Sequence, residues 1–124
     1  MKSIEINSFR LCGICYSNPK TYEESGNMYA TNTLVITGDN EKKYFIPIMA
    51  TGENAIVLSH LCRNGNKVMV QGDIKSKEHF NKSNGTSTIR VFFNVREIFV
   101  IKKMKQTKLN EKRIQDLTDL YGLD

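Results

Sequence analysis

The sequence predicts an all-β domain with one internal helix, followed by a short helix near the C-terminal end. Five stretches have the apolar–polar alternation, or the β-branched and aromatic content, that is typical of strands, and turn residues separate them. One helical stretch, residues 54–62, lies between the third and fourth strands. A helix at that place in a five-stranded barrel is the connectivity of an OB-fold, and barrels of that class commonly bind oligonucleotides.

The first three predicted strands span residues 4–16, 28–37 and 43–51. Gly13 lies in the middle of the first strand, where a glycine is typical of the bend that lets a small barrel turn a corner. Pro19 ends this strand, and residues 22–27 are predicted to form a turn. A hairpin loop at residues 38–41 is expected to join the second strand to the third.

The fourth strand, residues 67–77, has the clearest alternation in the chain. Val68, Val70 and Ile74 share one face with Gly72. The opposite face is polar and mostly basic, with Lys67, Met69, Gln71, Asp73, Lys75 and Lys77. We therefore expect one side of this strand to face a core and the other side to face outward.

A polar loop is predicted over residues 78–87, and the fifth strand over residues 88–101. On that strand one face carries Arg90, Phe92, Asn94 and Arg96. The sequence then changes character to a basic linker and a short amphipathic helix with the apolar stripe Ile114, Leu117 and Tyr121. These features divide the chain into a domain over residues 1–101 and a linker with a helix over residues 102–124.

The overall charge favours an anionic partner, because the formal net charge is +5 and the isoelectric point is about 9.2. The N-terminal residues do not have the apolar run of a signal peptide, and no stretch reaches the ~18 apolar residues of a membrane helix. We therefore expect a cytoplasmic protein without a membrane partner, whose three cysteines are reduced.

Catalytic, metal and redox chemistry are not predicted. Cys12 and Cys15 are three residues apart in a strand, so their side chains point to opposite faces and are not expected to hold one metal ion together. We expect buried, inert thiols instead. No nucleophile–base set, phosphate loop or paired carboxylates at helical spacing stand out, so an enzyme and a cofactor are not expected.

The pattern Arg63-x-Gly65-x-x-Val68-x-Val70-x-Gly72-x-Ile74 resembles the helix end and fourth strand of the bacterial and phage single-stranded DNA-binding protein family. Further pieces occur in the same order as in that family: Gly13, Asn18-Pro19, Ser25-Gly26-Asn27 and Asn94-Val95. The resemblance covers about the first hundred residues, one domain's worth. The chain does not have the long tail with an acidic, Pro-Phe-tipped peptide of the cellular members, and in this it looks more like a phage or plasmid member.

The resemblance implies single-stranded DNA as the partner and binding that is independent of base sequence. It also implies a homo-oligomer, dimer or tetramer, in a bacterial host cell, with replication or recombination proteins as possible further partners. Single strands are held by a basic groove and by aromatic side chains on which the bases stack. This predicts two groups of binding residues in the chain.

The first group meets the bases. Phe45 falls where a stacking tryptophan lies in the family, and His79 falls where another lies, whereas Asn40 occupies the position of a third and stacks poorly. The full set predicted to contact bases is Phe45, Phe80, Phe92, His79, Met49 and Tyr22. The second group, predicted to neutralise phosphates, is Lys67, Lys75, Lys77, Lys82, Arg90 and Arg96.

Plainer interpretations stay open for these residues. Aromatic residues in strands usually belong to a core, and single surface lysines are ordinary solvated charges. Two other functions also stay open: a protein–protein adaptor that kept the barrel and lost its ligand, and an RNA-binding OB domain.

Overall fold

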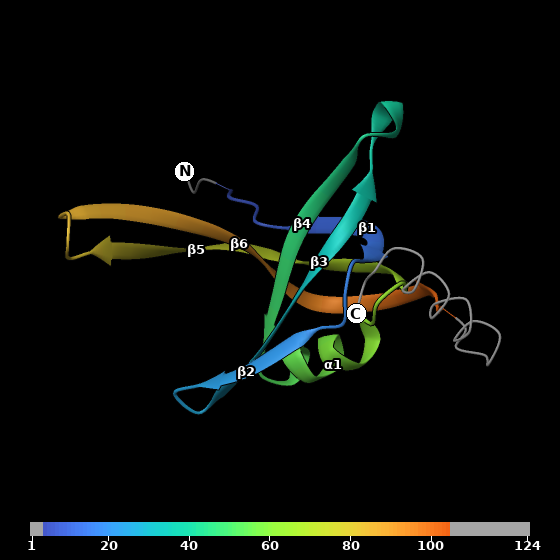
Figure 1. The fold of residues 1–124 in the computed structure, drawn as a ribbon, viewed down its shortest axis with the longest axis horizontal. Coiled ribbons are helices and arrows are strands. Elements are labelled where there is room, and N and C mark those ends of the chain that lie inside the picture. Colours follow the sequence, from blue (N-terminus) through green and yellow to red (C-terminus); the bar gives the residue numbers. More distant parts are fainter. Residues whose placement is uncertain (1–3, 105–124) are drawn as a thin grey trace, which may run out of the picture.

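A computed structural model of the chain describes residues 4–104 (Figure 1). Within them it has six strands, one α-helix and one 3₁₀ turn. In chain order these are β1 (Phe9–Cys15), β2 (Lys20–Glu24), β3 (Asn27–Thr37), η1 (Asp39–Glu41), β4 (Lys43–Thr51), α1 (Glu53–Leu61), β5 (Lys67–Asn81) and β6 (Thr86–Lys102). The predicted C-terminal helix lies outside the described residues.

The six strands form one sheet that closes on itself. Its order is β1-β5-β6-β4-β3-β2, and β1 also pairs with β3, through Ile14 and Cys15, so that the sheet becomes a ring. Among its strand pairs only β4 and β6 run parallel, with Ile48 beside Phe93. The predicted mostly-β fold with one helix before the long β5 strand is confirmed, and this arrangement is consistent with an OB-fold.

Gly13 lies where β1 leaves β5 and crosses to β3. A Cβ at this position would lie 2.7 Å from the carbonyl oxygen of Val35, so a side chain would push the two strands apart. The sequence predicts a bend at Gly13, and the structure places the closure of the ring next to it. Close backbone approach is the physical reason for a glycine here.

The core fills the ring and is closed by α1. The largest fully buried side chains are Leu34, Ile48, Leu58, Val68, Val70, Val95, Cys15 and Cys62. Ala55 and Leu58 are the buried residues of α1, which contacts β2, β3, β4 and β6. The alternation predicted for β5 is confirmed at Val68 and Val70, which are both fully buried.

The prediction of a turn over residues 22–27 is wrong. Lys20–Glu24 pairs in register with β3 as a separate strand, and the turn itself consists of Ser25 and Gly26, both with positive φ. Every residue of β2 is exposed, so this strand has no buried face. Its sequence therefore does not show the apolar–polar alternation by which a strand is recognised. The first strand is also shorter than predicted, because residues 4–8 lie outside β1 and have no regular secondary structure.

The prediction of a loop over residues 78–87 is also wrong. β5 and β6 stay paired from Ile74 opposite Phe93 to Asn81 opposite Thr86, and this long hairpin, residues 74–93, is called the arm below. Only residues 82–85 turn, with Gly85 at φ +69°. Figure 1 shows the arm extending away from the ring. Most of its side chains are exposed on both faces, so no core-facing side marks it as strand in the sequence.

Candidate nucleic-acid interface

The outward face of β3 and β4 meets the arm in a groove formed by two adjoining cavities, called the outer groove below. Their volumes are about 470 Å³ and about 450 Å³, and both are lined by Met49 and Phe92. The register of β3 and β4 explains which side chains line the groove. On β3 and β4 the side chains of Ala30, Ile48 and Ala50 point into the core. Their neighbours along each strand, such as Thr31 and Met49, therefore point outward.

An aromatic pair stands at one end of the outer groove. The Tyr16 and Phe45 rings meet edge to face, with centroids 5.6 Å apart and planes at 88°. Both residues are mostly exposed to solvent, Tyr16 at 62% and Phe45 at 56%. Phe45 thus faces outward, as the alternation of its strand predicts. Tyr16, which lines the smaller cavity, was missed; it directly follows the inward-facing Cys15, the last residue of the alternating strand β1.

A second aromatic pair stands at the other end. Tyr22 of β2 and Tyr29 of β3 are directly opposite in the strand register and stack in parallel, with centroids 5.1 Å apart and planes at 8°. Both line the larger cavity. Tyr22 was predicted to contact bases, whereas Tyr29 was not, because the predicted turn hid the pairing that brings the two rings together.

Basic side chains from the arm line the larger cavity beside these rings. In the strand register Lys75 lies opposite Phe92, and Lys77 lies opposite Arg90, so all four side chains are on one face of the arm. In residues 4–104 the ion pair found is Arg96 with Asp73. The three cations of the arm, Lys75, Lys77 and Arg90, therefore make no ion pair there. His79 is on the same face, nearer the tip, opposite Thr88.

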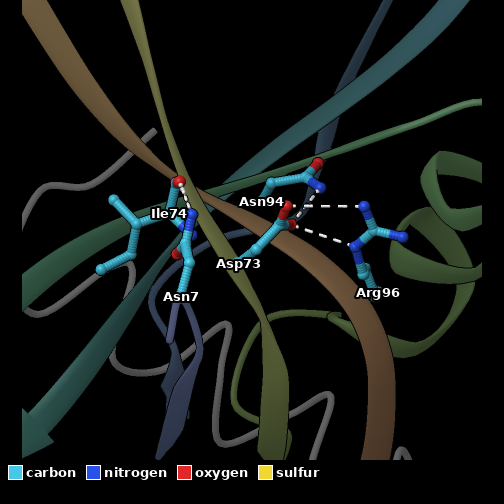
Figure 2. Close-up of polar contacts among 5 residues, drawn as sticks. All are labelled: Asn7, Asp73, Ile74, Asn94 and Arg96. Carbon is cyan, nitrogen blue, oxygen red and sulfur yellow. Dashed lines mark hydrogen bonds and ion pairs between the residues drawn. The ribbon is translucent and has the colours of Figure 1, made fainter. Parts of the chain in front are cut away.

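Arg96 is engaged elsewhere (Figure 2). Its Nε lies 3.1 Å from Oδ1 of Asp73, and Asn94 donates its Nδ2 to the same oxygen at 2.8 Å. The hydrogen bonds from Arg96 and Asn94 lower the pKa of Asp73 from 3.8 to about 2. Arg96 lines a different cavity with Phe9 and Arg10, so its charge offsets a carboxylate rather than facing the groove.

Three other predicted residues also lie apart from the groove. Lys67 begins β5 at the far end from the arm, opposite Lys102, and Lys82 lies in the turn at the tip of the arm. Phe80 lies opposite Ser87, on the other face of the arm from Lys75 and Lys77. The outer groove therefore brings together Phe92, Met49, Tyr22, Lys75, Lys77 and Arg90, and Phe45 adjoins it through its ring contact with Tyr16.

The cysteines divide between surface and core. Cys12 is exposed, which the expectation of buried thiols missed, while Cys15 and Cys62 are buried. A hydrogen bond with the Cys15 thiol, together with burial, raises the pKa of Cys62, so that its thiol stays protonated. As predicted, Cys12 and Cys15 point to opposite faces of their strand.

Neither metal-binding clusters nor membrane helices are found in the described part of the chain. Residues 4–104 contain no group of three or more His, Cys, Asp or Glu side chains arranged to hold a metal ion. The single α-helix of that region is too short to cross a bilayer.

Comparison with known protein families gives a match over most of the described residues. The model of the single-strand binding protein family matches residues 6–101, a range that contains the whole outer groove and all of the arm. No curated protein sequence matches the chain. Since the family match covers most of the chain and the strands that build the groove, the chain belongs to the single-strand binding protein family.

Proposed function

We propose that the protein binds single-stranded DNA in the outer groove, largely independently of base sequence. The observation that carries this proposal is the combination of two exposed aromatic pairs with Lys75, Lys77 and Arg90 along one continuous surface. Aromatic faces for unpaired bases and cations for the backbone are the two features that single-strand binding needs.

The bases are proposed to stack on the rings at the two ends of the groove. Phe45 and Tyr16 offer ring surface at one end, and Tyr22 offers it at the other. Phe92 and Met49 lie between them and supply an apolar floor. Each stacked base contributes ~1–3 kcal/mol, and every base has a π-face, so this contact does not select a sequence.

The phosphates are proposed to lie along the basic face of the arm. Lys75, Lys77 and Arg90 make no ion pair within the described residues, so their charge is available to an external anion, although Glu24 lines the same cavity. Neutralising three phosphates releases counterions, and the binding constant then falls steeply with added salt. His79, farther along the same face, extends the path toward the tip.

A homo-oligomer is part of the proposal. The outward face shared by β1, β5 and β6 has an apolar centre, in which Cys12 lies opposite Met69 and Met69 lies opposite Phe99, with Ile14 beside them; polar and charged residues such as Gln71 and Lys67 border it. Ile14 and Phe99 are exposed in the single chain, and burying them against a second copy would remove this surface from water. By binding single-stranded DNA, the protein is proposed to protect exposed strands during replication, recombination or DNA transfer.

The test is fluorescence anisotropy of a labelled oligothymidine across a salt series, compared with a duplex of equal length and with an RNA strand. We expect tight binding to the single strand that weakens with salt, and a loss of ~5- to 100-fold for Phe45→Ala or Phe92→Ala. Tyr44→Ala is the matched control, because Tyr44 is an exposed aromatic next to Phe45 that, unlike Phe45, does not pair with the Tyr16 ring at the groove.

Equal affinity for the duplex would show that charge acts without stacking and would contradict the proposed mechanism. No binding at low salt would reject the function and favour an adaptor protein. Tighter binding to the RNA strand would identify RNA as the ligand.

A further inference from the structure

The two strands of the arm are held differently where they leave the ring. On β6 a neighbouring strand holds the base of the arm, because Phe93 pairs with Ile48 of β4. On β5 the neighbouring strand ends earlier, since β1 pairs with β5 only as far as Phe9 opposite Gly72. Within residues 4–104 no strand borders that edge of β5 beyond this point. The start of the arm on β5 therefore has no strand beside it on its outer edge.

A single side chain takes the place of that strand. Asn7, two residues before β1 begins, donates its Nδ2 to the carbonyl oxygen of Ile74 at 2.7 Å. Its Oδ1 accepts from the Ile74 amide, also at 2.7 Å (Figure 2). One amide side chain thus satisfies both backbone groups of Ile74, as a paired residue on an adjacent antiparallel strand would.

The ladder between β5 and β6 is interrupted next to this contact. The register shifts between Gln71 and Gly72, and Arg96 is the extra residue of β6 at that point. Such a β-bulge bends its strand and leaves a residue out of the pairing. Gly72 suits the place, because a Cβ there would collide with the carbonyl oxygen of Asn94. The arm therefore begins at a point where the sheet is able to bend.

The direction of the arm sets the shape of the outer groove. One wall of the larger cavity belongs to the ring and carries Tyr22 and Tyr29, whereas the other wall belongs to the arm and carries Lys75, Lys77 and Arg90. A swing of the arm at the bulge would move the cations relative to the rings. The contacts of Asp73 with β6 hold the two strands of the arm to each other, but they do not reach β1.

We propose that Asn7 is a positioning residue for single-strand binding, whose two hydrogen bonds with Ile74 hold the arm at the angle at which its cations line the outer groove. The inference rests on the proposed function, because it concerns the geometry of that site. Asn7 lines neither cavity of the groove, so it acts on DNA only through the arm. When an arm swings freely, the apparent affinity falls by the fraction of molecules that have the binding geometry.

The test compares the wild type with Asn7→Ala, which removes both hydrogen bonds at an exposed position. The matched control is Asn18→Ala. Asn18 is also exposed, and its Oδ1 also accepts from a backbone amide, that of Asn64, outside the groove and the arm. Circular dichroism checks that all three proteins are folded.

Two results are expected for Asn7→Ala and not for the control. By NMR the Ile74 amide should exchange faster with solvent, and ¹⁵N relaxation should show larger motions of the free arm that subside when oligothymidine binds. The affinity for a short oligothymidine should fall by ~3- to 10-fold. The salt slope of binding should stay unchanged, because the same phosphates are contacted once the arm is in place.

The variant Asn7→Asp adds a readout that depends on the hydrogen bonds themselves. Its ionised carboxylate accepts from the Ile74 amide but repels the Ile74 carbonyl oxygen, whereas its protonated form donates to that oxygen as the wild-type amide does. Its affinity for oligothymidine, compared with the wild type at the same pH, should therefore recover as the pH falls from 7 to about 4.

An unchanged affinity of Asn7→Ala, or an Ile74 amide that exchanges as slowly as in the wild type, would overturn the inference and leave the proposed function intact. A reduced salt slope would also overturn it, because Asn7 would then belong to the path of the phosphates. Failure of the wild type to bind the oligothymidine would overturn the proposed function and, with it, this inference.

Discussion

At the scale of single residues, the site depends on which charges are free and which are already used. Lys75 and Lys77 face the outer groove and make no ion pair within the described residues, whereas Arg96, six positions along β6 from Arg90, forms an ion pair with Asp73. The alternation in the sequence predicts that the side chains of all these cations point outward. The partner of each depends on the strand register, which places Asp73 opposite Asn94 and within reach of Arg96.

The Asp73 carboxylate makes a prediction about pH. Its pKa is lowered from 3.8 to about 2 in the folded protein, so its contribution to stability is complete above about pH 5 and is lost as the pH falls from there through 2. Asp73→Asn should therefore be less stable than the wild type at pH 7, and the gap should narrow by pH 3. Urea denaturation at several pH values measures this.

Arg96→Gln provides the control for that interpretation. Removing the guanidinium should raise the pKa of Asp73 toward its ordinary value, as followed by the carboxyl carbon shift in NMR. A wild-type Asp73 that titrates near 3.8 would contradict the role assigned to the pair.

At the scale of elements, the arm is a strand pair without a core of its own. Its turn is fixed by local chemistry, with Asn81 accepting from the Ser83 amide and Asn84 accepting from the Thr86 amide. Asn84-Gly85 is a common hairpin-turn signal. Long strands with two exposed faces owe their pairing to the ladder itself and to the turn, which is why burial patterns do not reveal them.

Shortening the arm should separate stability from binding. Replacing residues 79–88 by Asn-Gly would join Glu78 to Ile89, which lie opposite each other in the register, through a two-residue turn. All replaced residues are exposed, so the melting temperature should stay within about 4 °C of the wild type. If Lys82 contacts phosphate, the salt slope of binding should fall by about one unit.

Thermal unfolding and anisotropy titrations across salt measure these two effects. A large drop in melting temperature would mean that the arm packs on the rest of the molecule. An unchanged salt slope would remove Lys82 from the set of phosphate contacts.

At the scale of the whole molecule, one sheet presents three surfaces with different chemistry. The outer groove is aromatic and basic, and the face of the arm that carries Phe80, Ile89 and Val91 is apolar and small. The outward face of β1, β5 and β6 is apolar around Met69 and Phe99, with charged and polar residues at its border. Each surface follows from the alternation along the strands that build it, because a strand side chain has only two directions to point.

The oligomer prediction belongs to the third of these surfaces. Phe99→Glu places a charge on the outward face of β6, so an assembly built there should dissociate while the chain stays folded, since Phe99 is exposed in the single chain. Sedimentation velocity together with circular dichroism measures both. Tyr44→Glu, at an equally exposed aromatic outside that face, should keep the wild-type oligomer. A monomeric wild type would contradict the prediction.

Sequence reasoning reaches the fold class, the helix before β5 and the inward row Val68 and Val70, because these depend on local alternation. It misses the Tyr22–Tyr29 stack and the arm, because both depend on pairing between exposed strands. Which of the predicted residues touch DNA stays a prediction. Six predicted residues line the groove: Met49, Tyr22, Lys75, Lys77, Arg90 and Phe92. Phe45 adjoins it through Tyr16, and the structure adds Tyr16 and Tyr29 to the groove.

The closure beside Gly13 also has a consequence for how the chain folds. β1 pairs with β5 across about sixty residues of sequence, Phe9 with Gly72, and must reach β3 as well before the ring exists. Pairings this distant form slowly, whereas the β5–β6 hairpin is local and forms early. During synthesis the groove cannot assemble before β6 emerges to lie beside β4, so a nascent chain acquires its binding surface only when nearly the whole domain has left the ribosome.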